Sequence, residues 1–196
     1  QQGIINMYVD HRGSGHYGKK GMALMHRNLG KWEMHDLIEA IKHLHTLPYV
    51  DKEKIGVIGH SYGGYVAAMA ITYGSEYVKY AISGSPVTDW RLYDSVYTER
   101  FMDTPQENPE GYIKSSTFTY IDKFKGKLRM THGEMDDNVH PQHALQFMDK
   151  LLDTGNTAEL MIYPGNRHGI WGPKRREYVK SNLNFWLKHF FNRQLD

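Results

Sequence analysis

The feature that most constrains the fold of this chain is a sharp, glycine-rich turn at residues 59–64, with the sequence Gly-His-Ser-Tyr-Gly-Gly. An apolar run at residues 55–58 leads into the turn, and a helix-like run at residues 65–71 follows it directly. A strand, a G-x-S-x-G turn and a helix in this order are typical of a nucleophile elbow, which presents the serine hydroxyl above a sheet. Glycines flank the serine because side chains there would collide with the neighbouring strand and helix. The pattern therefore predicts a layered α/β structure with Ser61 at the end of a strand.

Strand-like and helix-like segments alternate along the chain, which predicts a mostly parallel sheet with helices on both faces. The expected strands are residues 4–9, 54–58, 78–83, 128–132 and 159–163. The expected helices are residues 32–47, 62–73, 90–102, 109–114, 141–154 and 174–193. Because the sequence opens almost directly on an apolar strand-like run, we expect that N-terminal strands of the same sheet are missing from it.

Size and composition favour one folded domain: the chain has 196 residues, of which 40% are hydrophobic and 13% aromatic. Its 24 basic and 22 acidic residues give a formal charge of +2 and form no basic stripe, so we expect no nucleic-acid partner. The absence of cysteine excludes disulfides, thiolate metal sites and a cysteine nucleophile. It leaves the compartment open, and we expect a periplasmic or extracellular location in preference to a cytoplasmic one. No apolar run approaches the ~18 residues that would span a bilayer.

Two later loops offer chemical partners for Ser61. A serine hydroxyl needs a base within hydrogen-bonding reach, and that base needs a group that fixes its tautomer. Asp136 lies in the loop after the predicted strand at 128–132, and His168 lies in the loop after the last strand. Loops that follow parallel strands open on the same side of a sheet, so these side chains can meet. We therefore predict Ser61 as nucleophile, Asp136 as acid and His168 as base, with the main-chain N–H of Tyr62 holding an oxyanion.

Several segments resemble the catalytic domain of the prolyl oligopeptidase family of serine peptidases, in particular its dipeptidyl peptidase IV branch. They run over nearly the whole chain and comprise residues 10–15, 59–64, 94–100, 136–140 and 168–169. The resemblance implies an α/β-hydrolase fold, with residues 1–196 as the catalytic domain in the C-terminal part of a longer protein. It carries the three catalytic roles onto Ser61, Asp136 and His168, and it favours Asp136 over the adjacent Asp137.

The same resemblance implies a small apolar pocket for the residue before the scissile bond. The side chains expected to line this pocket are Tyr62, Val87, Trp90, Tyr93, Tyr97 and Val139. A proline ring is rigid and flat and has no N–H, so aromatic walls can select it by packing. Asn138 is expected to hydrogen-bond the substrate carbonyl one residue further upstream.

A serine exopeptidase is the activity that the resemblance implies, releasing N-terminal dipeptides after proline or alanine through an acyl-enzyme. Two parts of the complete family pattern are not found in this sequence. One is a tyrosine hydroxyl before the first strand, which acts as second oxyanion donor. The other is a β-propeller domain, whose paired glutamates hold the free amine of the substrate. We therefore expect the 196 residues alone to be inactive or weakly active. Family members often dimerise through the hydrolase domain, which makes the final helix a candidate homodimer surface.

Other functions fit parts of the same pattern. A tripeptidyl peptidase, an acylaminoacyl peptidase or an esterase would keep the three catalytic residues and change the substrate. A hydrolase-like interaction module without activity is the alternative outside the enzymes. Residues 13–18 also fit the G-x-G-x-x-G of a dinucleotide site. That site needs a helix at the motif and an acidic residue after the next strand, whereas lysines and a long helix follow here, so we expect only a tight loop.

Individual side chains also have plain structural interpretations. His140 and His143 could be metal ligands, but no third ligand is evident and we expect no metal ion or other cofactor. Asp136 could cap the helix that starts near Pro141, although Asp137 suits that task better. His60 is expected to be structural. The aromatic residues of the predicted helix at 90–102 recur at spacings of three and four, which is also typical of one packed helix face.

Overall fold

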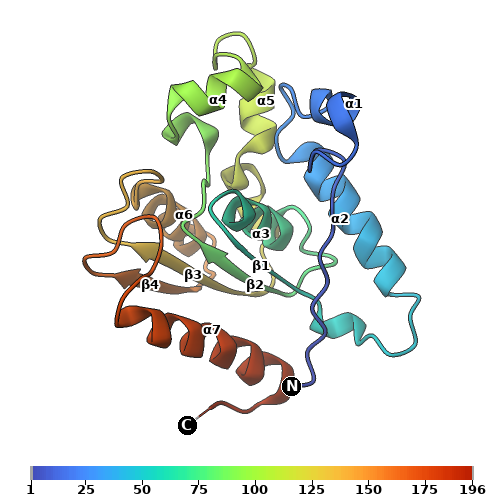
Figure 1. Cartoon of the computed structure of the whole chain (residues 1–196), viewed down its shortest axis with the longest axis vertical. Helices are drawn as coiled ribbons and strands as arrows, with labels where there is room; N and C mark the ends of the chain where they lie inside the picture. The colour runs from blue at the N-terminus through green and yellow to red at the C-terminus, as the bar shows by residue number, and fades with distance from the viewer. Residues whose placement is uncertain (1, 196) are drawn as a thin grey trace.

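A four-stranded parallel sheet forms the centre of the structure (Figure 1). The computed structural model describes residues 2–195. The strands are β1 (Gly56–His60), β2 (Tyr80–Gly84), β3 (Lys127–Gly133) and β4 (Glu159–Tyr163). They lie in the order β1-β2-β3-β4, and each neighbouring pair is parallel. All the carboxyl ends therefore meet at one edge of the sheet, and the loops that follow the strands gather there.

Helices cover both faces of this sheet. Helix α3 (Tyr62–Thr72) and helix α6 (Gln142–Asp153) lie on one face, and helix α7 (Lys174–Phe191) lies on the other (Figure 1). Helix α2 (Lys31–Leu44) packs against the outer side of α3. Helix α3 is buried almost all round because it lies between α2 and the sheet, which explains its nearly continuous apolar sequence. The expected α/β architecture, with a parallel sheet and helices on both faces, is confirmed.

The long connection between β2 and β3 contains most of the smaller elements. The remaining helices and 3₁₀ turns of the described residues are α1 (Gly18–Ala23), α4 (Ser95–Met102), α5 (Pro109–Ser115), Lys52–Lys54, Trp90–Leu92 and Thr117–Lys123. The single helix predicted over residues 90–102 was wrong. Asp94 interrupts it, because its backbone is extended and its side chain accepts a hydrogen bond from the N–H of Tyr97, which starts α4 afresh.

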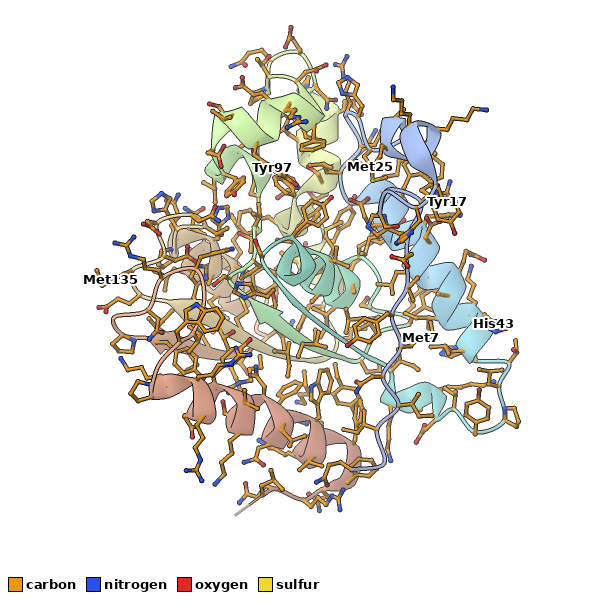
Figure 2. The ribbon with its side chains drawn as sticks, in the orientation of Figure 1. Met7, Tyr17, Met25, His43, Tyr97 and Met135 are labelled. Atoms are coloured by element: carbon orange, nitrogen blue, oxygen red, sulfur yellow. The ribbon has the colours of Figure 1, made fainter. Side chains whose placement is uncertain are left out.

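The strand predicted over residues 4–9 is not formed. This segment runs over the surface without regular structure, with the side chains of Ile5 and Tyr8 exposed at 69% and 97% (Met7 marks it in Figure 2). A strand needs a neighbour for its backbone N–H and C=O groups, and within residues 2–195 no strand pairs with this segment. Its apolar sequence alone was therefore misleading. The chain is anchored just before it, where the Arg193 side chain donates to the carbonyl oxygen of Gln2 at 3.0 Å.

No helix of the described residues is both long enough and apolar enough to cross a bilayer. The hydrophobic core lies between the sheet and the helices, and α3 contributes more of its buried side chains than any other element. Tyr65 is completely buried there, and its hydroxyl donates to the carbonyl oxygen of Ser115 at 2.8 Å. This contact ties α3 to the connection between β2 and β3, which carries most of the aromatic side chains described below.

Candidate active site

Ser61 occupies a strained turn between β1 and α3. Its φ of 59° and ψ of −119° are unusual for a residue with a side chain, and a conformation of this kind costs on the order of 1–3 kcal/mol. The turn is held from both sides. The N–H of Ser61 donates to the carbonyl oxygen of Gly84 at 2.8 Å, and the carbonyl oxygen of Ser61 accepts from the N–H of Tyr65 at 2.9 Å. These bonds fix the backbone so that the hydroxyl does not cap the helix and stays available.

The glycines around Ser61 differ in why they are needed. A Cβ atom on Gly59 would lie 2.1 Å from the carbonyl oxygen of Gly63, and one on Gly64 would lie 2.4 Å from that of Gly84. A Cβ atom on Gly63 would meet nothing within 4 Å. The expectation that close packing requires both flanking glycines was therefore wrong for Gly63. Space demands glycine at position 59 and, outside the pentapeptide, at position 64.

Three predicted site residues meet above the carboxyl ends of the strands. The Nε2 atom of His168 lies 2.8 Å from the Oγ atom of Ser61, and its Nδ1 atom lies 2.9 Å from Oδ2 of Asp136. A carboxylate oxygen only accepts hydrogen bonds, so Nδ1 carries the hydrogen and Nε2 accepts the serine O–H. In this arrangement the imidazole can take the serine proton while the carboxylate fixes the tautomer.

Asp136 is buried and surrounded by donors. Its Oδ1 atom accepts from the main-chain N–H groups of Asn138 at 3.1 Å and Val139 at 3.0 Å. Its Oδ2 atom faces His168 and also lies 3.3 Å from Nε2 of His132. Burial alone would raise the pKa of Asp136, but the hydrogen bonds from His132, His168 and the Asn138 N–H hold this pKa well below its usual range. The carboxylate therefore stays ionised beside His168.

The loop that carries Asp136 (the acid loop, residues 134–140) and the loop that carries His168 (the histidine loop, residues 164–169) are joined by main-chain contacts. The N–H of Met135 donates to the carbonyl oxygen of Asn166 at 2.8 Å. Gly133 permits this close approach, since a Cβ atom there would lie 2.0 Å from the carbonyl oxygen of Arg167. Asp137 points outward instead and pairs with Arg167 at 2.7 Å. The structure thus places Asp136, and not Asp137, against His168.

Helix α6 starts at Gln142 without a side-chain cap; its N-cap residue is Pro141. Neither Asp136 nor Asp137, the two capping candidates, therefore caps this helix. The carboxylate of Asp137 is engaged by Arg167, and that of Asp136 is turned back into its own loop. Both aspartates consequently serve the contact between the two loops and not the start of the helix.

The aromatic side chains of the predicted pocket form one cluster. Trp90 stacks on Tyr97 of α4 with ring centroids 5.9 Å apart, and it also contacts the rings of Tyr62 at 5.5 Å and Tyr93 at 6.0 Å (Tyr97 is labelled in Figure 2). The remaining predicted pocket residues, Val87 and Val139, are buried in the same hydrophobic core. These side chains come from the elbow, the β2–β3 connection and the acid loop, so the cluster is not the face of a single helix.

Tyr62 is held at its tip by a residue that the sequence did not single out. Its hydroxyl donates to Oε1 of Glu33, which lies in the first turn of α2 and is almost fully buried. Burial and the Glu33 charge raise the pKa of the Tyr62 phenol well above its ordinary value, so the hydroxyl remains a donor. A glutamate in a first helical turn is commonplace, and nothing local indicated this contact.

Asn138 lies at the exposed rim of this cluster. Its Oδ1 atom accepts a hydrogen bond from the Tyr93 hydroxyl at 2.6 Å. Because the amide oxygen is taken by Tyr93, the amide nitrogen is the group left to face an acceptor. This orientation suits a donor to a carbonyl oxygen.

The other histidines have different surroundings. The ring of His60 lies beside that of His168 with centroids 4.9 Å apart, and burial and the His168 charge lower the pKa of His60. His143 is completely buried and accepts from the N–H of Thr88 at its Nδ1 atom, whereas His140 is exposed. Among residues 2–195, no group of three or more histidine, cysteine, aspartate or glutamate side chains is placed to hold a metal ion.

The glycine-rich segment at residues 13–18 lacks the surroundings of a dinucleotide site. No strand precedes it within the described part of the chain, and the helix that follows, α1, has only 6 residues. Arg12, just before it, forms an ion pair with Asp36 of α2 and lies 4.1 Å from the centroid of the Trp32 ring. The segment is therefore a loop fastened to α2.

Comparisons with known proteins agree with this architecture. A sequence model of the prolyl oligopeptidase family matches residues 1–194. The chain belongs to the prolyl oligopeptidase family. It is 39% identical over 194 residues to probable dipeptidyl-aminopeptidase B of Neurospora crassa, a match that covers 97% of this chain and 21% of that protein. The protein of the same name from Paracoccidioides lutzii is 40% identical with the same coverage. The chain thus spans about a fifth of the length of the curated relatives it matches.

Solved structures of this family show the same fold. The crystal structure of dipeptidyl peptidase 4 from Porphyromonas gingivalis superposes with a TM-score of 0.87 at 38% sequence identity. The match covers 95% of this chain and 26% of that one. The predicted resemblance to the dipeptidyl peptidase IV branch is confirmed, and the fold is the α/β-hydrolase fold.

Proposed function

We propose that this chain carries the serine-peptidase chemistry of the prolyl oligopeptidase family, with Ser61 as nucleophile, His168 as base and Asp136 as acid. The observation that carries the proposal is the continuous connection from Ser61 Oγ to His168 Nε2 at 2.8 Å and from His168 Nδ1 to Asp136 Oδ2 at 2.9 Å. Side chains 107 and 32 residues apart in sequence are brought within hydrogen-bonding distance. Such an arrangement has the geometry that general-base activation of a hydroxyl requires.

In the proposed reaction, Ser61 attacks the carbonyl carbon of the scissile peptide bond while His168 takes the hydroxyl proton. The negative charge that develops on the carbonyl oxygen is held by the main-chain N–H of Tyr62 and by the positive end of α3. The imidazolium, stabilised by Asp136, then gives its proton to the leaving amine, which departs and leaves an acyl-enzyme. Water, activated by His168 in the same way, attacks the ester and frees Ser61.

Substrate choice is proposed to come from the aromatic cluster. Tyr62, Val87, Trp90, Tyr93, Tyr97 and Val139 would enclose a proline or alanine side chain before the cleaved bond, and Asn138 would donate to the preceding carbonyl. The stacking of Tyr97 on Trp90 and the contact of the tilted Tyr62 ring with Trp90 support this, because aromatic rings offer flat apolar walls. The orientation of Asn138 by Tyr93 supports the carbonyl contact.

The release of dipeptides from N-termini is the finer part of the proposal. It is supported by relatives named dipeptidyl-aminopeptidase B and dipeptidyl peptidase 4. We propose that the chain is the C-terminal catalytic part of a longer peptidase, whose N-terminal propeller domain holds the free amine of the substrate. Peptides with proline or alanine next to the cleaved bond are then the substrates of the whole protein.

Labelling with a fluorophosphonate tests the nucleophile. We expect a single covalent adduct on Ser61 in the whole protein, lost in Ser61→Ala, with Ser83→Ala as a matched control because Ser83 is buried and donates to the carbonyl oxygen of Gly64. Labelling that survives Ser61→Ala would refute the assignment. Rates on Gly-Pro, Ala-Ala-Pro and acyl-alanine reporters then separate dipeptidyl, tripeptidyl and acylaminoacyl peptidases, and an ester reporter detects an esterase.

A further inference from the structure

A second histidine contacts the acid of the proposed triad. His132 lies near the carboxyl end of β3, and its side chain is completely buried. The acid loop after β3, residues 134–140, turns back so that two of its groups reach this imidazole (Met135 of the loop is labelled in Figure 2). His132 has no role in the proposed general-base chemistry or in the proposed packing of the substrate.

The surroundings of His132 determine which ring nitrogen carries the hydrogen. Its Nε2 atom lies 2.7 Å from the carbonyl oxygen of Val139 and 3.3 Å from Oδ2 of Asp136. Both of these oxygens can only accept, so Nε2 is the donor. The Nδ1 atom is buried and has no hydrogen-bond partner among the described residues. A hydrogen there would be an unpaired buried donor, which is unfavourable.

The Nε2–H of His132 thus has the carbonyl oxygen of Val139 as its nearer acceptor, and its second, longer contact ends at the same oxygen atom of Asp136 that His168 contacts. The 2.9 Å contact from His168 and the 3.3 Å contact from His132 both end at Oδ2, while the main-chain N–H groups of Asn138 and Val139 end at Oδ1. With these donors on both of its oxygens, the Asp136 carboxylate cannot rotate without losing a hydrogen bond. The donor from β3, a strand paired with both β2 and β4, sets where Oδ2 lies.

We propose that His132 is a positioning residue of the triad, which holds Oδ2 of Asp136 toward His168 through its Nε2–H. The inference rests on the proposed function, in which Asp136 orients the base. His132 touches neither Ser61 nor substrate in this scheme and acts only through Asp136. Without it, the carboxylate loses its link to β3, and the carbonyl oxygen of Val139 loses its donor.

Two substitutions separate the donor from the packing. His132→Gln places an amide nitrogen the same number of bonds from the main chain as Nε2, so it keeps the donor. His132→Leu keeps apolar bulk and removes the donor. If the leucine variant fails to fold, His132→Asn is used in its place, because its amide is one bond shorter and stops short of the position of Nε2. Folding of each variant of the 196-residue chain is checked by its ¹H–¹⁵N spectrum.

The side-chain ¹⁵N chemical shifts of the histidines give a readout that needs no activity. In the wild-type chain we expect His132 with its hydrogen on Nε2 and His168 with its hydrogen on Nδ1. In the folded leucine or asparagine variant the His168 signals should move toward a mixture of tautomers, while the glutamine variant should keep the wild-type pattern. A His132 hydrogen on Nδ1, or an unchanged His168 in a folded leucine or asparagine variant, whose side chain cannot donate to Oδ2 of Asp136 from the position of Nε2, would overturn the proposal.

The rate of fluorophosphonate labelling of Ser61 in the whole protein gives the second readout. Loss of a hydrogen bond to a charged group should slow labelling by about 10-fold or more in His132→Leu, and His132→Gln should stay within about 3-fold of wild type. In an Asp136→Asn background the same His132→Leu change should have little further effect. Equal slowing by the glutamine and leucine variants, or undiminished slowing in the Asp136→Asn background, would overturn the proposal. If the whole wild-type protein is not labelled, the proposed function fails and the ¹⁵N shifts alone decide on His132.

Discussion

At the scale of single residues, the adjacent Asp136 and Asp137 show how strongly surroundings divide identical side chains. Asp136 is 2% exposed and accepts hydrogen bonds at both carboxylate oxygens, whereas the exposed Asp137 makes a surface ion pair with Arg167. The sequence pattern ranked Asp136 first, but only the fold shows why. The buried carboxylate can orient His168, and the exposed one contributes little, since surface ion pairs are weak.

Substituting each aspartate in turn should separate these roles. Asp136→Asn should slow the labelling of Ser61 by roughly 10³-fold or more, because an amide can favour the wrong tautomer of His168. Asp137→Asn should stay within about 3-fold of wild type, because its ion pair is solvent-exposed. The measurement is the second-order rate of fluorophosphonate labelling, with the circular dichroism spectrum as a check on folding. Similar losses in both variants would contradict the assignment of the acid.

At the scale of elements, the sequence predicted the strands of the sheet and the helices that cover it, but it failed at two other segments. Periodicity and the strand–turn–helix pattern located all four strands of the observed sheet and its covering helices, because each of these signals is local. The strand at residues 4–9 failed because a strand also depends on a neighbour, and the helix at 90–102 failed because one aspartate restarts it. Glu33 was not predicted as part of the site because its partner Tyr62 is distant in sequence and is brought to it only by the folded chain. His132 was not predicted because, although its partners follow closely in sequence, only the turn of the acid loop brings them onto its ring.

The elbow between β1 and α3 allows a matched test of close packing. Gly59→Ala should destabilise the protein by more than about 1 kcal/mol, because its methyl group would overlap the carbonyl oxygen of Gly63 and the turn would have to open. Gly63→Ala has free space and lies inside a helix, where alanine is favoured over glycine by up to about 1 kcal/mol, so it should be neutral or stabilising. Urea unfolding of both variants measures the difference. Equal destabilisation would show that the turn is not limited by space at Gly59.

At the scale of the whole molecule, buried histidines link folding to pH. His143 of α6 is completely buried with the N–H of Thr88 on its Nδ1 atom, and burial, helped by the charge of His132, lowers its pKa to about 4. The charge of Asp89 raises the pKa of His143, whereas the charge of His140 lowers it, as burial does. The unfolded chain binds a proton at this residue below its ordinary pKa of about 6.5, whereas the folded chain does so only near pH 4. Acid therefore favours unfolding throughout the interval between these values.

The free energy of unfolding should fall as pH decreases from 7 to 4, and His143 alone should account for up to about 3 kcal/mol of that loss. In His143→Asn, whose side-chain oxygen can still accept from Thr88, the baseline stability should be lower and the pH dependence flatter. His140→Asn, at an exposed position, should change the wild-type slope much less, because burial lowers the His143 pKa more than His140 does. Urea unfolding at pH 7, 5.5 and 4 provides the comparison. Parallel curves for wild type and His143→Asn would refute the role of His143.

The order of the strands has a consequence for synthesis of the protein. Ser61 and His168 are 107 residues apart, and the loops that carry Asp136 and His168 follow the last two strands of the described sheet. A nascent chain on the ribosome exposes its elbow long before these loops have been translated. The proposed hydroxyl nucleophile thus remains an ordinary alcohol throughout elongation, and the cell meets its reactivity only after the final strand has docked.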